Sequence, residues 1–188
     1  MKVFWITGCI GAGKSEVCRI IATMGVPVFN SDTIAKTLME NDPELKQALI
    51  LRFGDGVYTQ ERLNREWLAN ILFSDEASRH FVESIVHRRV HETFKEWKSR
   101  QTSESAVRES APLLSIDLTK QTDNIVLVAC PQEIRLARVL QRSGMNQEKF
   151  MERSRLQHTE EEIKPFTHSE IINDGRPLLP QVWAALGR

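Results

Sequence analysis

The sequence predicts an α/β protein with a doubly wound, mostly parallel sheet of five strands. Three observations support this fold class. Short apolar segments alternate with longer segments whose apolar residues recur at helical spacing. Residues 125–130 form a continuous apolar run, which is typical of a parallel strand covered on both faces. A glycine-rich loop separates the first strand from the first helix, and ligands of such sheets bind at the carboxyl ends of strands.

The first two predicted strands are each followed by a helix. Residues 3–6 are apolar, and the helix after them runs from about Ser15 to Gly25, where glycine favours a stop. Residues 26–29 form the second strand, and Ser31 or Asp32 is a candidate N-cap of the next helix. Apolar residues keep helical spacing in both helices: Val17, Ile20, Ile21 and Met24, then Ile34, Ala35, Leu38 and Met39.

The middle of the chain is predicted to be helical. Asp42-Pro43 is typical of a helix start with proline at the first position, and Gly54 ends this helix. Asn64 is a candidate cap for a short helix. A long amphipathic helix extends from residue 74 to about residue 100, with an apolar stripe formed by Phe81, Ile85, Val90, Phe94 and Trp97.

The C-terminal part returns to alternating strands and helices. The predicted strands are 106–107, 125–130 and 169–172, and the predicted helices are 131–142, 146–157 and 177–186. Pro131 opens the first of these helices, and Ser143-Gly144 interrupts it. Asn173-Asp174-Gly175 predicts a turn after the last strand.

The loop from Gly8 to Ser15 fits the pattern G-x-x-x-x-G-K-[ST] and lies between a predicted strand and a predicted helix. Its glycines allow successive N–H groups to point at phosphate oxygens. Lys14 can follow the β- and γ-phosphates of ATP, and the Ser15 hydroxyl suits Mg²⁺. A glycine-rich turn that binds nothing is the alternative, but the full spacing in this context favours nucleotide binding. The candidate nucleotide-binding residues here are Gly8, Gly11, Ala12, Gly13, Lys14, Ser15 and Glu16.

Composition limits the other functions. Lys and Arg total 25, as do Asp and Glu, so the formal net charge is zero and neither bulk nucleic-acid binding nor an anionic membrane surface is indicated. Cys9, Cys18 and Cys130 lack metal-ligand spacing and are expected to be reduced intracellular thiols. No apolar run approaches the ~20 residues of a membrane span, and we expect no signal peptide and a cytoplasmic location.

Three further groups of polar residues are candidates for chemistry. Arg138 and Arg142 are four residues apart, so they share one helix face and can neutralise a transferring phosphoryl group; a solvated basic face is the alternative. Asp32 follows the second strand and is either an N-cap or a group that orients or deprotonates an acceptor hydroxyl. His87 and His91 have the spacing of a metal pair, but no third ligand is suggested, so His87 is interpreted as a polar contact at a cleft edge.

These residues form an ordered series that resembles the dephospho-CoA kinase family over nearly the whole chain. Residues 6–15 are similar to the family's TGGIGSGKS, and residues 25–32 to GxPVIDAD. Further segments follow the family's order: Phe53-Gly54, Leu63-Asn64-Arg65 and Ile71-Leu72-Phe73 (FG…LDR…IF), Val86-His87 (LHP), residues 111–114 (VPLL), residues 138–142 (RLxxR), Arg153 with Gln157 (RxxxQ), and residues 172–175 (IxNxG).

The resemblance implies a P-loop kinase fold and ATP- and Mg²⁺-dependent phosphorylation of the ribose 3′-hydroxyl of dephospho-CoA. It implies one domain over residues 1–188, with a helical acceptor-binding insertion at about 42–100 and a lid at about 138–160, in a monomer or weak homo-oligomer. The implied roles are hydroxyl-orienting group or base for Asp32, phosphoryl stabilisation for Lys14, Arg138 and Arg142, acceptor binding for Arg65 and His87, and a place near adenine for Asn173 and Gly175.

Three positions depart from the family's pattern. Asn30 replaces the first aspartate of the DAD motif, and Ser115-Ile116 replaces a pair that ends in glutamate. Arg88 replaces proline after His87, which is expected to let the long helix continue.

Two other functions share part of this pattern. A nucleoside monophosphate kinase has a similar loop, lid arginines and sheet, but the Asp32 and His87 segments disfavour it. A regulatory GTPase needs a guanine-selecting N-K-x-D element; Thr119-Lys120-Gln121 is the nearest segment and lacks the asparagine.

Overall fold

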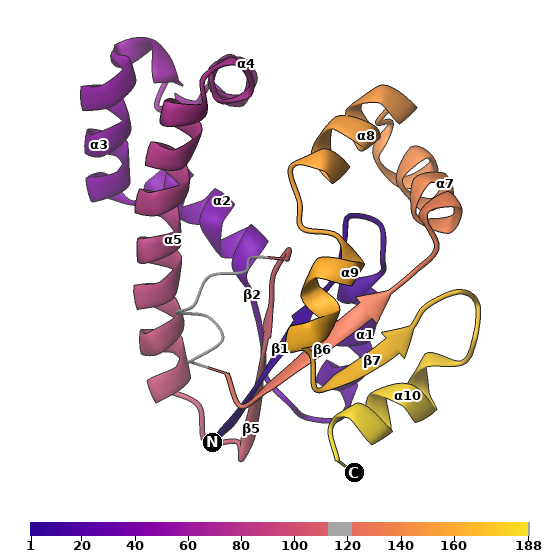
Figure 1. The fold of residues 1–188 in the computed structure, drawn as a ribbon. Coiled ribbons are helices and arrows are strands. Elements are labelled where there is room, and N and C mark those ends of the chain that lie inside the picture. The colour runs from indigo at the N-terminus through magenta and orange to yellow at the C-terminus, as the bar shows by residue number, and fades with distance from the viewer. Residues whose placement is uncertain (113–121, 188) are drawn as a thin grey trace. The chain divides into compact units, whose positions relative to one another are not determined.

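The computed structural model describes residues 1–112 and 122–187 (Figure 1). Leu114, Ser115-Ile116 and Thr119-Lys120-Gln121 lie outside the described residues. The chain forms two compact units. Residues 1–30 and 101–188 make up the first, here called the sheet unit, and residues 31–100 make up the second, the helical unit.

The sheet unit contains a five-stranded parallel sheet with the strand order β2-β5-β1-β6-β7. The central strand β1 pairs with β5 on one side, where Phe4 lies opposite Val107, and with β6 on the other, where Phe4 lies opposite Asn124. The predicted fold class is therefore confirmed. The strand bounds are β1 Lys2–Thr7, β2 Val28–Asn30, β5 Ser105–Glu109, β6 Asn124–Ala129 and β7 Ser169–Ile172.

Helices cover both faces of this sheet. On one face, α1 (Lys14–Thr23) and α10 (Leu178–Ala185) pack against alternate strand residues (Figure 1). On the opposite face, Leu127 and Ala129 of β6 pack against Ile163 of α9 (Glu160–Ile163). The first face holds the main apolar core, formed by Phe4, Ile6, Val107, Val126, Val128 and Ile171 from the strands and by Val17, Ile21 and Val182 from the two helices.

Three helical segments connect β6 to β7. They are α7 (Gln132–Ser143), α8 (Gln147–Arg155) and α9, which continues into the short helix η2 (Lys164–Phe166). Gly144 ends α7 with a φ of 61°, and the Asn146 side chain caps α8 by accepting from Lys149 N at 2.9 Å. The sequence analysis missed α9, although Thr159 and Glu162 form a capping box at its start.

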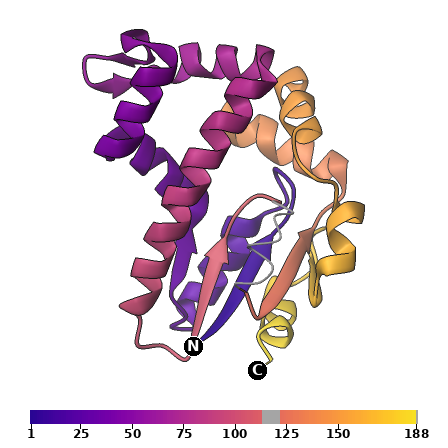
Figure 2. The same cartoon turned by 60° about the vertical axis from the view of Figure 1, so that its left-hand side comes forward.

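The helical unit consists of four α-helices, one short 3-10 helix and a short hairpin among its described elements. They are α2 (Ser31–Asn41), α3 (Pro43–Phe53), η1 (Asp55–Val57), β3 (Tyr58–Thr59), β4 (Arg62–Leu63), α4 (Arg65–Ser74) and α5 (Glu76–Ser99). The predicted helix start at Asp42-Pro43 and the predicted cap Asn64 are confirmed: the Asp42 side chain accepts from Leu45 N at 3.0 Å, and the Asn64 side chain accepts from Trp67 N at 3.2 Å. Helix α5 is unbroken at Arg88, as expected without proline (Figure 2).

Three local predictions in the helical unit need correction. Ser31 and Asp32 are the first two residues of α2, so they lie inside the helix instead of in front of it. The buried stripe of α5 includes Val82 and Val86, whereas Phe81, Ile85 and Trp97 are half-buried. The β3–β4 hairpin was missed because Gln60 and Glu61 take φ values of 49° and 64° without a glycine to mark the turn.

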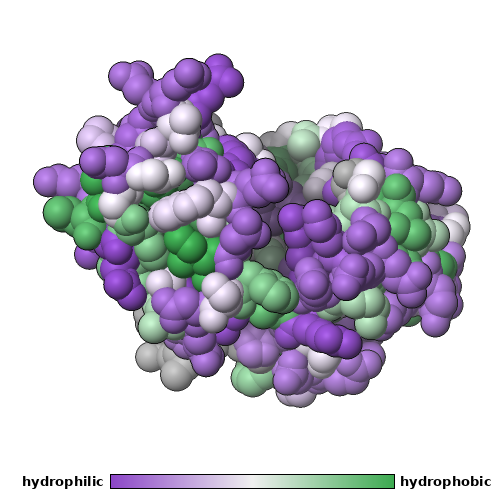
Figure 3. All heavy atoms as spheres, turned by 90° about the horizontal axis from the view of Figure 1, so that it is seen from above, coloured by the Kyte–Doolittle hydropathy of each residue, from purple (hydrophilic) through white to green (hydrophobic). Residues whose placement is uncertain are grey.

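Hydrophilic residues make up most of the face seen in Figure 3, in keeping with a chain in which acidic and basic residues balance. Among the described residues, no helix combines the length and apolarity needed to cross a membrane.

Candidate active site

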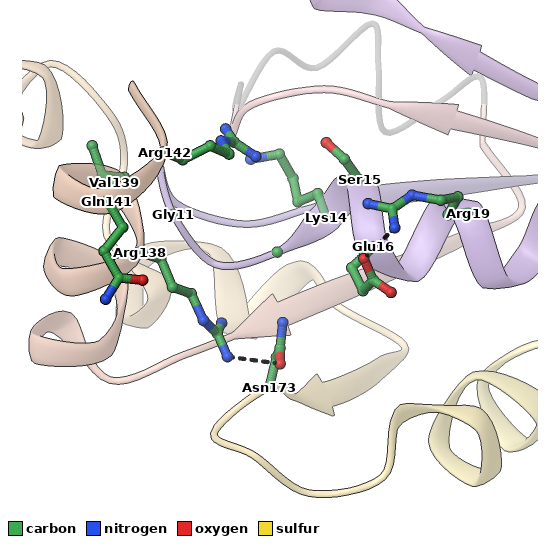
Figure 4. Close-up of a pocket in the computed structure, with 11 residues that line it drawn as sticks. Gly11, Lys14, Ser15, Glu16, Arg19, Arg138, Val139, Gln141, Arg142 and Asn173 are labelled. Carbon is green, nitrogen blue, oxygen red and sulfur yellow. Dashed lines mark hydrogen bonds and ion pairs between the residues drawn. The ribbon is translucent and has the colours of Figure 1, made fainter. Parts of the chain in front are cut away.

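The sheet unit contains a pocket of about 470 Å³ around the glycine loop (Figure 4). This size is within the usual range for small-molecule sites. Most of the predicted residues of this unit meet here, although Gly8, Ala12 and Gly175 do not line the pocket. The lining residues are Gly11, Gly13, Lys14, Ser15, Glu16, Arg19, Arg138, Val139, Gln141, Arg142 and Asn173.

Glycines are required in the loop because neighbouring groups come very close. A Cβ on Gly11 would lie 2.7 Å from the backbone O of Arg135, and one on Gly13 would lie 2.1 Å from Asn173 Nδ2. Both glycines also have φ values in the left-handed region, 81° and 93°. The glycines therefore let α7 and the residue after β7 approach the loop backbone directly.

Lys14 is the first residue of α1, and its ammonium group lies back over the loop. Its Nζ donates to the backbone O of Gly8 at 2.7 Å and approaches that of Cys9 at 3.4 Å. Lys14 and the neighbouring Ser15 thus meet the pocket at the N-terminus of a helix, where N–H groups and the helix dipole favour anions.

Asn173 connects the loop to α7. Its Nδ2 donates to the backbone O of Ala12 at 2.9 Å, and its Oδ1 accepts from Arg138 Nη2 at 3.1 Å (Figure 4). Asn173 is buried, and its backbone N bonds to Ala129 O. Arg142 lies one turn beyond Arg138 and is exposed at the same pocket. Gly175 lies in the turn after β7 with a φ of 112°.

Arg135 is a structural residue that the sequence analysis did not select. Only 8 % of the residue is exposed, so Arg135 does not belong to a solvated basic face. Its Nε donates to Cys130 O at 3.0 Å, and its Nη1 reaches Ile10 O at 3.5 Å. Gln157 accepts from Ile10 N at 2.8 Å. Arg135 and Gln157 therefore hold the outer part of the loop.

Glu109 is a buried acidic residue bonded to Ser15 of this site, and the sequence analysis missed it. It is the last residue of β5, next to β1 in the sheet, and only 5 % of it is exposed. Its carboxylate accepts from Ser15 Oγ at 2.9 Å and from Asn30 Nδ2 at 2.6 Å. Burial and this nearby carboxylate raise the pKa of the Cys18 thiol. The sequence feature that could have identified Glu109 as a site residue is its position, as an acidic residue at the carboxyl end of a strand.

Comparisons with known proteins identify the family. The family model described as dephospho-CoA kinase matches residues 3–177. The chain belongs to the dephospho-CoA kinase family. It is 37 % identical to a dephospho-CoA kinase from Bacteroides fragilis, over 94 % of this chain and 87 % of that protein.

Two solved structures have a similar fold. A crystal structure of a Thermus thermophilus protein matches with a TM-score of 0.86 and 31 % identity, over 98 % of this chain and 95 % of that one. The dephospho-CoA kinase from Campylobacter jejuni matches with a TM-score of 0.68 and 20 % identity, covering 100 % of this chain and 99 % of that chain, which supports the fold.

The geometry accounts for one departure from the pattern of dephospho-CoA kinases. Asn30 stands in place of the first aspartate of the DAD motif and donates to Glu109. An aspartate at this position would bring a second carboxylate against Glu109, and the two charges would repel each other. The Asn30 amide instead donates a hydrogen bond to the buried Glu109 carboxylate, so Glu109 is the acidic residue of this pair.

The remaining predicted residues all belong to the helical unit. Asp32 is exposed in the first turn of α2, and His87 is exposed on α5. Arg65 is the first residue of α4, and its Nη2 lies 3.1 Å from Glu40 Oε2 of α2. This bond is the largest cause of a lowered pKa of the Glu40 carboxyl. In the structure, the Arg65 side chain is therefore bound to α2 through Glu40.

Proposed function

We propose that this protein transfers the γ-phosphoryl group of ATP to the ribose 3′-hydroxyl of dephospho-CoA, giving coenzyme A and ADP. Membership of the dephospho-CoA kinase family, together with the pocket of about 470 Å³ at the glycine loop, carries the proposal. A nucleoside monophosphate kinase is not favoured, because the matching family spans almost the whole chain, including the helical unit.

ATP is expected to bind with its phosphates against the loop and its base toward the turn after β7. The loop N–H groups and Lys14 lie where phosphate oxygens are stabilised. Arg138 and Arg142 supply positive charge from α7, and such charge is worth most where it develops in the transition state. Asn173 and Gly175 follow β7, which supports their assignment near adenine.

The donors around Ser15 fit Mg²⁺. A hydroxyl and a carboxylate are hard oxygen ligands, and Mg²⁺ is usually held by one or two such groups together with substrate phosphates. Ser15 Oγ lines the pocket, and Oε1 of the buried Glu109 accepts from it at 2.9 Å. We assign these two residues to the ion, which when bound neutralises charge on the phosphates.

The acceptor is assigned to the helical unit through Asp32, Arg65 and His87. Asp32 would orient the 3′-hydroxyl or accept its proton, Arg65 offers a planar cation, and His87 an exposed polar ring. We further propose that the protein is a monomer or weak homo-oligomer and that it works in the cytoplasm. The three free buried cysteines support the location, because disulfides are rare in the cytosol.

The choice of phosphoryl acceptor tests the proposal most directly. A coupled assay of ADP formation with dephospho-CoA should give turnover, with coenzyme A as product, and much lower turnover with a panel of nucleoside monophosphates. Equal or greater activity with a nucleoside monophosphate would overturn the assignment.

Replacing Asp32 by asparagine should lower turnover on the order of 10²-fold. Asparagine retains the shape and a hydrogen-bonding oxygen but cannot take a proton. Asp32 is exposed in a first helical turn, so thermal stability should change little. Turnover and thermal midpoint are measured for Asp32→Asn and Asp32→Ala. Full activity in Asp32→Asn would leave Asp32 as a helix-terminus residue only.

Arg142→Ala should lower turnover more than it raises the KM for ATP, because the contact strengthens as charge moves in the transition state. Its exposure predicts an unchanged thermal midpoint. Arg138→Ala should lower the midpoint as well, since Arg138 bonds to Asn173. Arg155→Ala, an exposed arginine at the end of α8, is the control. An effect of Arg142→Ala on KM alone would mark a ground-state nucleotide contact.

A further inference from the structure

The helical unit contains its own basic pocket, of about 570 Å³, and Arg65 is the one lining residue that the preceding assignments use. It lies between α2 and the start of α4, with β4 on one side. Three cations and one carboxylate line it: Lys36, Arg62, Arg65 and Glu40. The pocket lies wholly within the helical unit.

The hairpin that carries Arg62 is fixed to α2. The Tyr58 hydroxyl donates to Met39 O at 2.6 Å, and Leu63 N donates to Glu40 Oε1 at 3.2 Å. Burial raises the pKa of Tyr58 to about 12, so this hydroxyl stays protonated and remains a donor. In β4 the side chains alternate, with Leu63 buried and Arg62 exposed. Arg62 is therefore presented to the pocket by a fixed backbone.

The charges in the pocket divide into a paired and an unpaired set. Glu40 binds Arg65 and, through its other oxygen, Leu63 N, so it fixes Arg65 and offsets one positive charge. Within the described residues, neither Lys36 nor Arg62 forms a salt bridge of its own. The pocket consequently keeps an excess of two positive charges, which suits a ligand with two or more negative charges.

The position of Lys36 relates this pocket to the acceptor. Lys36 is four residues after Asp32, so the two residues share one face of α2, about 6 Å apart along the helix axis. In dephospho-CoA the 3′-hydroxyl and the 5′-diphosphate are substituents of the same ribose. A ribose whose 3′-hydroxyl faces Asp32 thus has its diphosphate within reach of the next helical turn.

We propose that this basic pocket binds the diphosphate of the acceptor, with Lys36 and Arg62 as its charged ligands and Arg65 held in place by Glu40. This inference rests on the proposed function. It assigns the specificity for a ribose that carries a 5′-diphosphate to α2 and β4. Arginine is suited to phosphate by its planar donors, and lysine acts as a mobile point charge.

Three variants test the pocket: Lys36→Gln, Arg62→Gln and the double variant. Each single change should raise the KM for dephospho-CoA and the Kd of dephospho-CoA measured by calorimetry without ATP about tenfold, and the double change about 100-fold. Turnover at saturation and the KM for ATP should stay near wild type. Lys95→Gln, an exposed lysine of α5 outside the pocket, is the control and should resemble wild type.

The outcomes separate this inference from the proposed function. Wild-type affinity for dephospho-CoA in the double variant, in a protein that forms coenzyme A, overturns the pocket and leaves the function standing. A wild-type protein that forms no coenzyme A overturns the function. In that case the calorimetric Kd still decides: affinity lost in the double variant supports the diphosphate site, and unchanged affinity rejects it. A rise in the KM for ATP alone also rejects it.

Discussion

Lys14→Ala is expected to lower turnover on the order of 10³-fold while leaving the fold intact. The side chain lies over the glycine loop at the pocket, where its charge stabilises the transferring phosphoryl group. Two backbone oxygens accept from its Nζ, one at 2.7 Å and one at 3.4 Å, so the free energy of unfolding should fall by about 1–3 kcal/mol. Steady-state kinetics and chemical denaturation of the same preparation give both quantities.

Lys2→Ala is a matched control for this variant. Lys2 has the same charge but begins β1, so it lies at the opposite end of that strand from the loop, and its side chain is exposed. It should keep wild-type turnover. Equal turnover in Lys14→Ala and Lys2→Ala would contradict the assignment of phosphate binding to the glycine loop.

The loop was predictable because its function depends on contiguous residues. Gly8 to Ser15 form the site from one stretch of backbone, and the strand before it and the helix after it are both marked by apolar periodicity. Asn173, by contrast, was assigned near the nucleotide only through the family resemblance. Its hydrogen bond to Ala12 joins residues 161 positions apart, and no local pattern encodes that contact.

The contacts of Glu109 could not be predicted from the sequence, because they depend on the order of the strands in the sheet. The sheet places β5 between β2 and β1, and this arrangement alone brings Glu109 to both Asn30 and Ser15. In the sequence, Glu109 stands beside Arg108 after the predicted strand 106–107, and charged residues of these types are mostly exposed in proteins. In the structure both residues are buried.

Arg135 was not selected from the sequence for a related reason. It stands on the same helix as Arg138 and Arg142, and helical spacing alone does not say which arginines face solvent. The carbonyl groups that it binds, those of Cys130 and Ile10, come from the end of β6 and from the glycine loop. Every residue has a backbone carbonyl, so the sequence does not show which carbonyls an arginine will bind. A buried arginine such as Arg135 therefore cannot be distinguished in the sequence from a solvent-exposed one.

Glu109→Gln is expected to raise the Mg²⁺ concentration needed for half-maximal activity by about 10- to 100-fold and to lower turnover. The amide keeps one oxygen that accepts from Ser15 Oγ, but it removes the negative charge. Its NH₂ group would also meet the Asn30 Nδ2 donor, unless the Asn30 amide rotates to present its oxygen. A loss of stability of about 1–2 kcal/mol should accompany the change.

The control for Glu109 stands at the other end of the same strand. Glu104 immediately precedes β5 and is exposed, so Glu104→Gln removes an equal charge from the sheet unit without touching Ser15. Activity is titrated with Mg²⁺ at fixed ATP in both variants, and unfolding is followed in parallel. A shifted Mg²⁺ requirement in Glu109→Gln but not in Glu104→Gln supports the assignment of the ion to Ser15 and Glu109. Loss of stability with an unchanged Mg²⁺ requirement would mean that Glu109 only holds Ser15 and Asn30 in place, and the ligand of the ion would then have to be another residue.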